Sequence, residues 1–488
     1  MEKHKTSPAA PAKSLGDVAL ILHGHAPFVR QPGRDAAGEE ALHGLIANSY
    51  APLLAGLYDL VDAGVRVRLG LALSPLLLEQ LADPVVQKHT LQSLEAAVAR
   101  ADERVQEHKS QHDEHGAYVA QFYSQLHRRT LHIFERKFGR NLVAATRMLA
   151  ESGVVEILAH TATHVVPAMH DRTSLRVQLE AGLISILRHL GQRPSILWAA
   201  DDPLPAELVN LLPPLGLRGV IGPADPMAPV AATHWINERK TVWALTPDPR
   251  LPLHVRSASL GYPSDMLYRA PASGPLSDGM LTTSGAAYDP YHAYARTRLH
   301  AQHFIAVLEE LRRHQPSHLV FACPLEVFGS SWFEGGLWLR TLIEQLHRAP
   351  TLKLCRPSTV AAQYPPTYRV DLPPLAAQSD PELAAAAARM RALVAAYPRA
   401  YGDREEVLNQ AARELALAQG GDWDRWGASA YAAHQRATHL ANFHHLCELS
   451  VHEVLLPVAA REFAALKERD NPFPALNYRL FGTQEDTE

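Results

Sequence analysis

The feature that most constrains the fold is a series of short apolar runs that end abruptly at polar or charged residues. The run Val18-Ala19-Leu20-Ile21-Leu22, residues 154–159 and residues 196–198 are each of strand length, and stretches of helical periodicity separate them. Strands that alternate with helices favour a parallel sheet, either open or closed. In a parallel α/β barrel, functional residues stand where a strand stops and its loop begins. The sequence therefore predicts an α/β fold with functional residues at these strand ends.

Histidines stand directly after two of these runs. His23 and His25 follow the first run, and they point to the same side because side chains along a strand alternate with a period of two. His164 follows the second run. Imidazoles in this position can bind a metal or hydrogen-bond to a polar ligand. The alternative is a set of loop histidines without a functional partner.

The third run ends in two carboxylates. It passes through Trp198 to Asp201 and Asp202, which are followed by a proline. Their place at a strand end favours a role in a site. The alternative is a helix N-cap or a turn, because aspartate before proline often marks one.

Composition excludes several classes of protein. The net charge of −4 and the absence of any block of like charges give no signal for binding to nucleic acid or a membrane surface. No apolar stretch reaches the length of a membrane span. Cys323, Cys355 and Cys447 are too few and too scattered for a disulfide framework or a zinc ribbon, which fits a reducing compartment. We expect a cytoplasmic protein.

The pattern along the chain predicts three parts. Residues 1–16 lack the apolar core of a signal peptide and are expected to form a disordered tail. Residues 17–365 contain the alternating strands and helices, with a helical insertion at about 75–150. Residues 222–290 have the composition of long loops. Residues 380–482 show helical periodicity without a strand pattern, which predicts a helical C-terminal domain.

In their order and spacing, several segments resemble glycoside hydrolase family 57, and within it the α-1,4-glucan branching enzymes. The resemblance extends from about Asp17 to about Phe481. The segments that carry it are His23-Gly24-His25-Ala26-Pro27-Phe28-Val29-Arg30, Ala162-Thr163-His164, the strand at Trp198, Gly261-Tyr262-Pro263, His300-Ala301-Gln302-His303-Phe304, Glu326-Val327-Phe328-Gly329 with Trp332-Phe333-Glu334-Gly335, Asp422-Trp423 and Glu468-Arg469-Asp470-Asn471-Pro472-Phe473-Pro474. The resemblance implies an incomplete (β/α)7 barrel with a helical insertion and an all-helical C-terminal domain.

The resemblance also implies a retaining mechanism, in which one carboxylate attacks the sugar and a second protonates the leaving oxygen. Asp201 matches the nucleophile, a glutamate in the family's Trp-Leu-Pro-Glu run, but is shorter by one methylene. A displacement of ~1 Å in a catalytic group can lower the rate on the order of a hundredfold. Pro324 matches the acid/base aspartate and has no proton to give, whereas general acid catalysis contributes roughly 10²–10⁴-fold. Glu326 is a candidate substitute.

The family's sugar contacts can be carried over to a set of histidines and aromatic residues in this chain. They are His23, His25, His164, Trp198, Tyr262, His303, Trp332 and Trp423. The resemblance implies that these residues line a groove and that its partners are glycogen- or amylose-type α-glucan chains. It implies no cofactor and no tightly bound zinc. The segment Arg256-Ser257-Ala258-Ser259 stands where the family has Trp-Ser-Ala-Asp.

Three functions stay open. The first, which we expect, is a pseudoenzyme that binds α-glucan and has lost or strongly impaired transglycosylation. The second is an active retaining branching enzyme in which Asp201 attacks and Glu326 or Asp202 supplies the proton. The third is a metal-dependent hydrolase whose ligands are His23, His25, His164 and Asp201.

Overall fold

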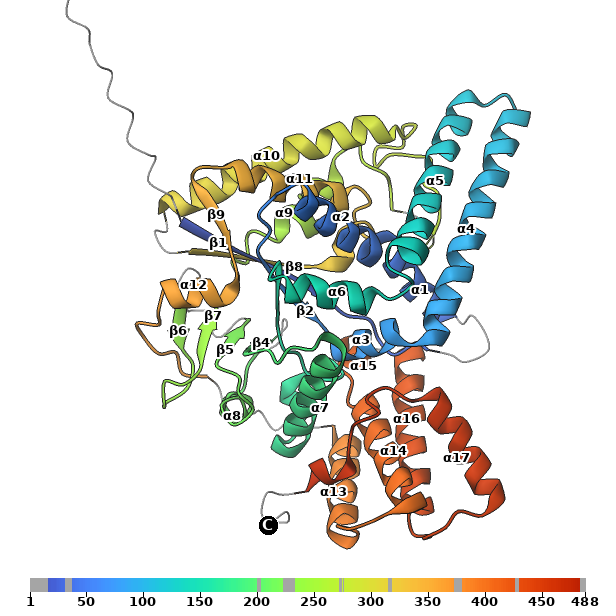
Figure 1. Ribbon diagram of the computed structural model, residues 1–488, viewed down its shortest axis with the longest axis vertical. Coiled ribbons are helices and arrows are strands. Elements are labelled where there is room, and N and C mark those ends of the chain that lie inside the picture. The colour runs from blue at the N-terminus through green and yellow to red at the C-terminus, as the bar shows by residue number, and fades with distance from the viewer. Residues whose placement is uncertain are drawn as a thin grey trace, which may run out of the picture.

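Parallel strands around one central strand, β1 (Gly16–Gly24), form the middle of the molecule (Figure 1). The computed structural model describes residues 16–30, 37–199, 203–222, 233–271, 274, 276–314, 318–372, 380–425 and 430–482. The other parallel strands of the ring are β2 (Leu69–Leu73), β3 (Val155–Ile157), β4 (Ile196–Trp198), β5 (Gly219–Ile221), β7 (Trp243–Leu245) and β8 (His318–Pro324). The predicted tail lies outside the described residues, apart from Gly16.

Hydrogen bonds connect these seven strands into an incomplete barrel. β1 pairs with β2 on one edge and with β8 on the other, and β2 continues to β3. An isolated bridge between Ala159 and Leu197 leads to β4, which pairs with β5 and then β7. Just after β7, the amide of Asp248 donates to the carbonyl of Val320 in β8 at 2.9 Å. The predicted (β/α)7 architecture is confirmed.

Alternate side chains of the strands fill the inside of the barrel. Ala19 and Ile21 of β1 share a buried cluster with Val320 and Ala322 of β8 and with residues of β4, β5 and β7. Because side chains alternate with a period of two, the next inward positions on these strands are 23 and 324. His23 and Pro324 are direct partners in the β1–β8 register. The strand geometry thus places them side by side at the carboxyl end of the barrel.

Two further strands extend the sheets. β6 (Thr233–Trp235) runs antiparallel to β7, and β9 (Leu352–Cys355) pairs with the first residues of β1. The expectation of long loops over residues 222–290 missed β6 and β7, and no sequence pattern predicted β9. These strands have three or four residues, which is too short for a recognisable alternation.

The helices cover the outside of the barrel. The chain from residue 37 to residue 190 contains α1 (Ala37–Leu45), the π-helical turn η1 (Ile46–Tyr50), α2 (Ala51–Asp62), α3 (Pro75–Ala82), α4 (Pro84–Ser110), α5 (Glu114–His132), the π-helical turn η2 (Ile133–Lys137), α6 (Leu142–Glu151), the 3-10 turn η3 (Pro167–Met169) and α7 (Arg172–Leu190). The barrel is completed by α8 (Ala206–Leu211), α9 (Leu253–Arg256), the 3-10 turn η4 (Tyr262–Ser264), α10 (Pro290–His314), the 3-10 turn η5 (Leu325–Val327), α11 (Gly335–Arg348) and α12 (Pro357–Gln363).

The predicted helical insertion is present as a pair of long antiparallel helices, α4 and α5, which stand beside the barrel in Figure 1. Aspartates fix where both helices begin. The side chain of Asp83 accepts from the amides of Val85 and Val86, and that of Asp113 accepts from the amide of Gly116. Each of these bonds satisfies a donor that the first helical turn leaves unpaired.

The C-terminal part is all-helical and lies below the barrel in Figure 1. It contains α13 (Pro381–Ala396), α14 (Gly402–Ala418), α15 (Asp422–Arg425), α16 (Ala430–Leu449), α17 (Pro457–Arg469) and the 3-10 turn η6 (Tyr478–Phe481). Its core also includes Phe28 and Leu76 from the barrel side. Arg30 donates to the carbonyls of Glu468 and Arg469. The exact boundaries of the domains stay a prediction.

In the part of the chain that the structure describes, every helix is too short or too polar to serve as a membrane span.

We expect Gly329→Ala to destabilise the fold by at least about 2 kcal/mol. Gly329 has a φ of 102°, and a Cβ there would lie 1.9 Å from the carbonyl oxygen of Asn48. Gly285→Ala is the matched control, since its φ of +81° is also positive but nothing lies within 4 Å of its Cβ. Denaturant unfolding followed by tryptophan fluorescence measures both. Equal losses of stability would show that backbone strain alone, and not the contact with Asn48, constrains this turn.

Candidate active site

Three residues at the carboxyl ends of β1, β4 and β8 surround the mouth of the barrel. The ring of His23 stacks on Trp198, with 4.6 Å between ring centroids and 23° between planes. Pro324, opposite His23, is half-buried and has φ −62° and ψ 137°, a conformation that proline adopts without strain. Pro324 therefore ends β8 without distorting it, and it places no ionisable group at the mouth. Its correspondence to an acid/base position stays a prediction.

The electrostatic environment keeps His23 neutral. Burial, together with the neighbouring groups His160, Arg256 and His25, lowers the pKa of His23 to about 3. A neutral imidazole offers one N–H donor and one acceptor nitrogen. His23 is thus equipped to exchange hydrogen bonds with hydroxyl groups, and not to attract anions.

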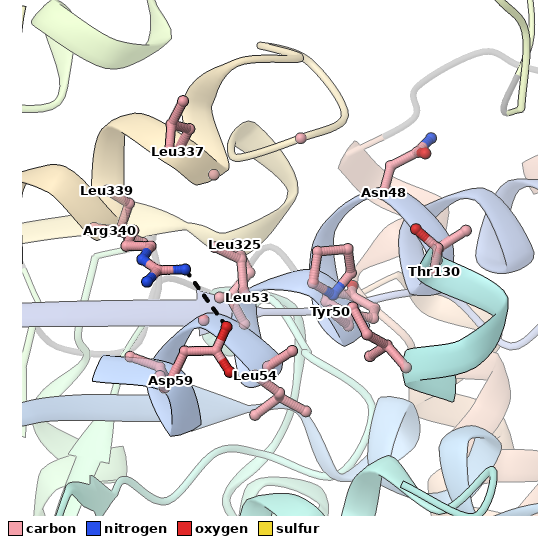
Figure 2. A pocket seen from close by; sticks show the side chains of 18 of the residues that line it. Asn48, Tyr50, Leu53, Leu54, Asp59, Thr130, Leu325, Leu337, Leu339 and Arg340 are labelled. Carbon is pink, nitrogen blue, oxygen red and sulfur yellow. Dashed lines mark hydrogen bonds and ion pairs between the residues drawn. The ribbon is translucent and has the colours of Figure 1, made fainter. Parts of the chain in front are cut away.

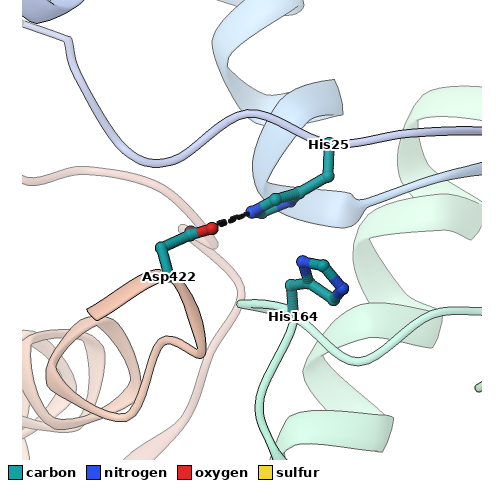
Figure 3. A group of neighbouring side chains, drawn as sticks. All are labelled: His25, His164 and Asp422. Atoms are coloured by element: carbon teal, nitrogen blue, oxygen red, sulfur yellow. Dashed lines mark hydrogen bonds and ion pairs between the residues drawn. The ribbon is translucent and has the colours of Figure 1, made fainter. Parts of the chain in front are cut away.

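His25 connects the barrel to the C-terminal helices (Figure 3). Its Nε2 lies 2.9 and 2.8 Å from the two carboxylate oxygens of Asp422 in α15. Its Nδ1 lies 2.7 Å from Oγ of Ser74. The ring of His164 meets His25 edge-on, with 4.3 Å between centroids. The mouth is consequently built from segments at opposite ends of the sequence.

The Ser74–His25–Asp422 arrangement contains the residue types of a nucleophilic triad, but its serine is structural. Ser74 has 0% exposure, and its Oγ accepts from the amide of Leu77 at 3.2 Å as the N-cap of α3. A nucleophile must reach a substrate atom. Ser74 cannot, so its role is to orient the His25 ring.

Among the described residues, the predicted metal ligands His23, His25 and His164 do not form one group. The ligand atoms of His25, His164 and Asp422 lie within 4.8 Å of one another, whereas His23 is not part of this group. Asp201 and Asp202 lie outside the described residues. The His25 contacts form a consistent network without an ion, because the Ser74 hydroxyl can donate to Nδ1 while Nε2–H donates to Asp422.

Glu326 lies beside the mouth in η5 and is held by two hydrogen bonds. Its Oε1 accepts from the amide of His25 at 2.9 Å and from the hydroxyl of Tyr50 at 2.6 Å. Burial raises the pKa of Glu326, and both hydrogen bonds oppose this rise. A carboxyl whose pKa is raised retains its proton at higher pH, as a general acid requires.

Several aromatic residues that the resemblance assigns to sugar contacts are packed in the walls. Trp332 is 2% exposed, and Tyr262 is buried, with its hydroxyl 2.8 Å from Nδ1 of the exposed His303. Trp423 is 5% exposed, and its Nε1 donates to the carbonyl of Leu417 at 2.7 Å. Their contact with substrate stays a prediction.

Three residues near the mouth were not selected as site residues from the sequence. Asp422 had a signal, since it precedes Trp423 in one of the segments of the resemblance. Arg256, at the exposed end of α9, replaces the first residue of a family motif. Tyr50 had no signal, because a tyrosine within a helical stretch is usually a core residue.

Comparison with known proteins identifies the family of this chain. A family model described as glycosyl hydrolase family 57 matches residues 19–373, and one described as 1,4-alpha-glucan branching enzyme, C-terminal, matches residues 382–481. A 1,4-alpha-glucan branching enzyme of Thermococcus kodakarensis is 26% identical over 529 aligned residues, which cover 94% of this chain and 77% of that protein.

Solved structures share the fold. A branching enzyme of the same family from Pyrococcus horikoshii superposes with a TM-score of 0.85 at 24% identity, covering 97% of this chain and 98% of that one. An alpha-amylase of Thermotoga maritima superposes with a TM-score of 0.83 at 22% identity, covering 96% and 99% of the two chains. The similarity therefore extends over both the barrel and the C-terminal helices.

We expect His23→Asn to weaken the acid sensitivity of the fold. The pKa of His23 is lowered to about 3 from an ordinary value of about 6.5. At a pH between these two values, His23 therefore binds a proton in the unfolded chain and not in the folded chain. Stability therefore rises with pH in this window, by up to about 1.4 kcal/mol per pH unit for one group. The variant should reduce the slope of unfolding free energy against pH.

The control for this prediction is His314→Asn, at the exposed end of α10, which should leave the slope unchanged. Equal slopes for His23→Asn and the unmodified protein would contradict the assignment of a neutral His23.

Proposed function

This chain belongs to glycosyl hydrolase family 57, and on that premise we propose that it is an α-1,4-glucan-binding protein of the branching-enzyme type whose transglycosylation is lost or strongly impaired. The observation that carries the proposal is Pro324. It stands at the inward-facing end of β8, in register with His23, at the position that the resemblance assigns to the acid/base. Without a proton donor there, the glycosidic bond would have to break with an alkoxide as leaving group.

Recognition of glucan is supported by the rest of the mouth. The neutral His23, its stack with Trp198 and the neighbouring His164 supply polar edges and an aromatic wall. Such surfaces suit the hydroxyl groups and apolar faces of glucose rings. A site that keeps these groups while losing its proton donor is expected to bind glucan chains and leave them intact.

We predict that the purified protein introduces no branches into amylose, as measured by debranching the product and profiling its chains. The double variant Pro324→Asp with Asp201→Glu restores both family carboxylates and should gain branching activity. Pro324→Asn with Asp201→Glu is the matched control, because asparagine has the shape of aspartate without a transferable proton. Branching by the unmodified protein at a typical enzymatic rate, about 1–10³ per second, would refute the proposal.

We predict that maltoheptaose binds to the unmodified protein and that His164→Ala weakens this binding at least tenfold, as measured by calorimetry. His314→Ala, at the end of α10, should leave the affinity unchanged. Trp423→Ala is a poorer test, because this buried side chain also supports the fold. Absence of maltoheptaose binding by the folded protein would refute the glucan-binding part of the proposal.

A second function, an active branching enzyme, is favoured by one observation, the raised pKa of Glu326. Oε1 accepts both hydrogen bonds, so Oε2 is the oxygen able to carry the proton. In this case Glu326→Gln would lower the branching rate by on the order of a hundredfold or more. Activity would be present below the pKa of Glu326 and lost as pH rises through it.

Tyr50→Phe separates this second function from a purely structural role of Glu326. The Tyr50 hydroxyl stabilises the charged carboxylate, so its removal raises the pKa of Glu326 further. If Glu326 is the proton donor, the alkaline limb of the activity profile should move to higher pH. An unchanged profile would exclude Glu326 as the donor.

A further inference from the structure

A pocket of about 270 Å³ lies between α2, α5 and α11, behind the wall of the barrel mouth (Figure 2). Aliphatic side chains form most of its surface, among them Leu53, Leu57, Leu126, Ile133, Leu339 and Ile343. Tyr50 and Leu325 separate it from Glu326. No part of the proposed glucan site accounts for a space with such apolar walls, since sugars require polar partners.

Two π-helical turns border this pocket. Asn48 and Tyr50 belong to η1, and Ile133 begins η2. Turns of this kind are rare and occur frequently at functional sites, because each one interrupts the regular hydrogen-bond pattern of a helix. Here both interruptions lie on the helices that enclose the same space.

This pocket is partly open to solvent, and its apolar space is large beside the voids of a packed interior. Protein cores contain few voids larger than a water molecule. An engineered apolar cavity of about 150 Å³ stays dry and binds benzene. The present pocket is nearly twice as large, and by that comparison it accommodates roughly ten to twelve carbon atoms.

One cation on the pocket wall lacks a counter-charge. Arg129 of α5 is a solvent-exposed residue of the pocket lining, and no ion pair joins it to a carboxylate in the described ranges. By contrast, the other arginine of the lining, Arg340, faces Asp59 at 3.4 Å (Figure 2). The remaining acid, Glu334, is buried, accepts from the Tyr288 hydroxyl and has a raised pKa. The lining therefore has an unbalanced positive charge at Arg129.

We propose that this pocket binds one medium-chain fatty acid, with the hydrocarbon chain among the leucines and the carboxylate on the Arg129 guanidinium. Burial of the chain supplies a stabilisation proportional to its apolar area, and a charge-assisted hydrogen bond fixes the head group. The inference does not depend on whether the barrel mouth binds or branches glucan.

Calorimetric titration of the full-length protein with decanoate, and with decan-1-ol as the uncharged chain, tests this proposal. We expect saturable, one-to-one binding of decanoate. Arg129→Gln should weaken decanoate binding at least tenfold and leave decan-1-ol binding unchanged. Arg136→Gln, an exposed arginine in η2 with 72% of its side chain accessible, is the matched control and should change neither affinity.

Leu126→Trp fills the pocket and should abolish binding of both chains, with circular dichroism confirming that the variant is folded. If this variant does not fold, NMR provides a second test. The carbon-13 signal of carboxyl-labelled decanoate should shift when the unmodified protein is added and should not shift when Arg129→Gln is added. Lack of saturable decanoate binding, or equal effects of Arg129→Gln and Arg136→Gln, would overturn the proposal.

Discussion

The parallel pairing of β1 with β8 is the interaction on which the rest of the site depends. It runs from Asp17–His318 to His23–Pro324 without a break, so the register of the two strands decides which side chains face each other at the mouth. A slip of β8 by one residue would turn Pro324 away from the interior, to which His23 points. The amide of His25, two residues beyond the ladder, then holds Glu326. One strand pair thus fixes the places of both Pro324 and the Glu326 carboxyl beside it.

Burial gives the ionisable groups around the mouth properties that differ from those in water. It lowers the pKa of His23 and raises that of Glu326, so both groups favour their uncharged forms. A mouth with neutral side chains suits a neutral ligand such as a sugar. Under the second proposed function, catalysis at this mouth would require Glu326 to hold its proton.

Much of the barrel was predictable because its signals are local. A strand that stops at histidine or tryptophan can be recognised from a few residues. In the structure, the ring of His23 contacts Trp198 and the ring of His25 contacts His164. The strand of three residues at 243–245 left no comparable pattern.

What could not be predicted depends on distant contacts. Asp422 acquires its role only through His25, and Tyr50 only through Glu326, a partner 276 positions away. The presence of an aromatic residue in a motif also did not show whether its side chain is exposed. Trp332 is buried against Tyr262, Tyr268 and Trp338, and Trp423 is buried near His439; a motif does not encode that packing.

The bond between His25 and Asp422 also orders events during synthesis. The two residues are 397 positions apart, so the ribosome makes the second roughly 20–80 s after the first at about 5–20 residues per second. Strands β2 to β9 are made within that interval, and the mouth still lacks one side when they are complete. The nascent chain therefore cannot complete the mouth until α15 (Asp422–Arg425) has emerged.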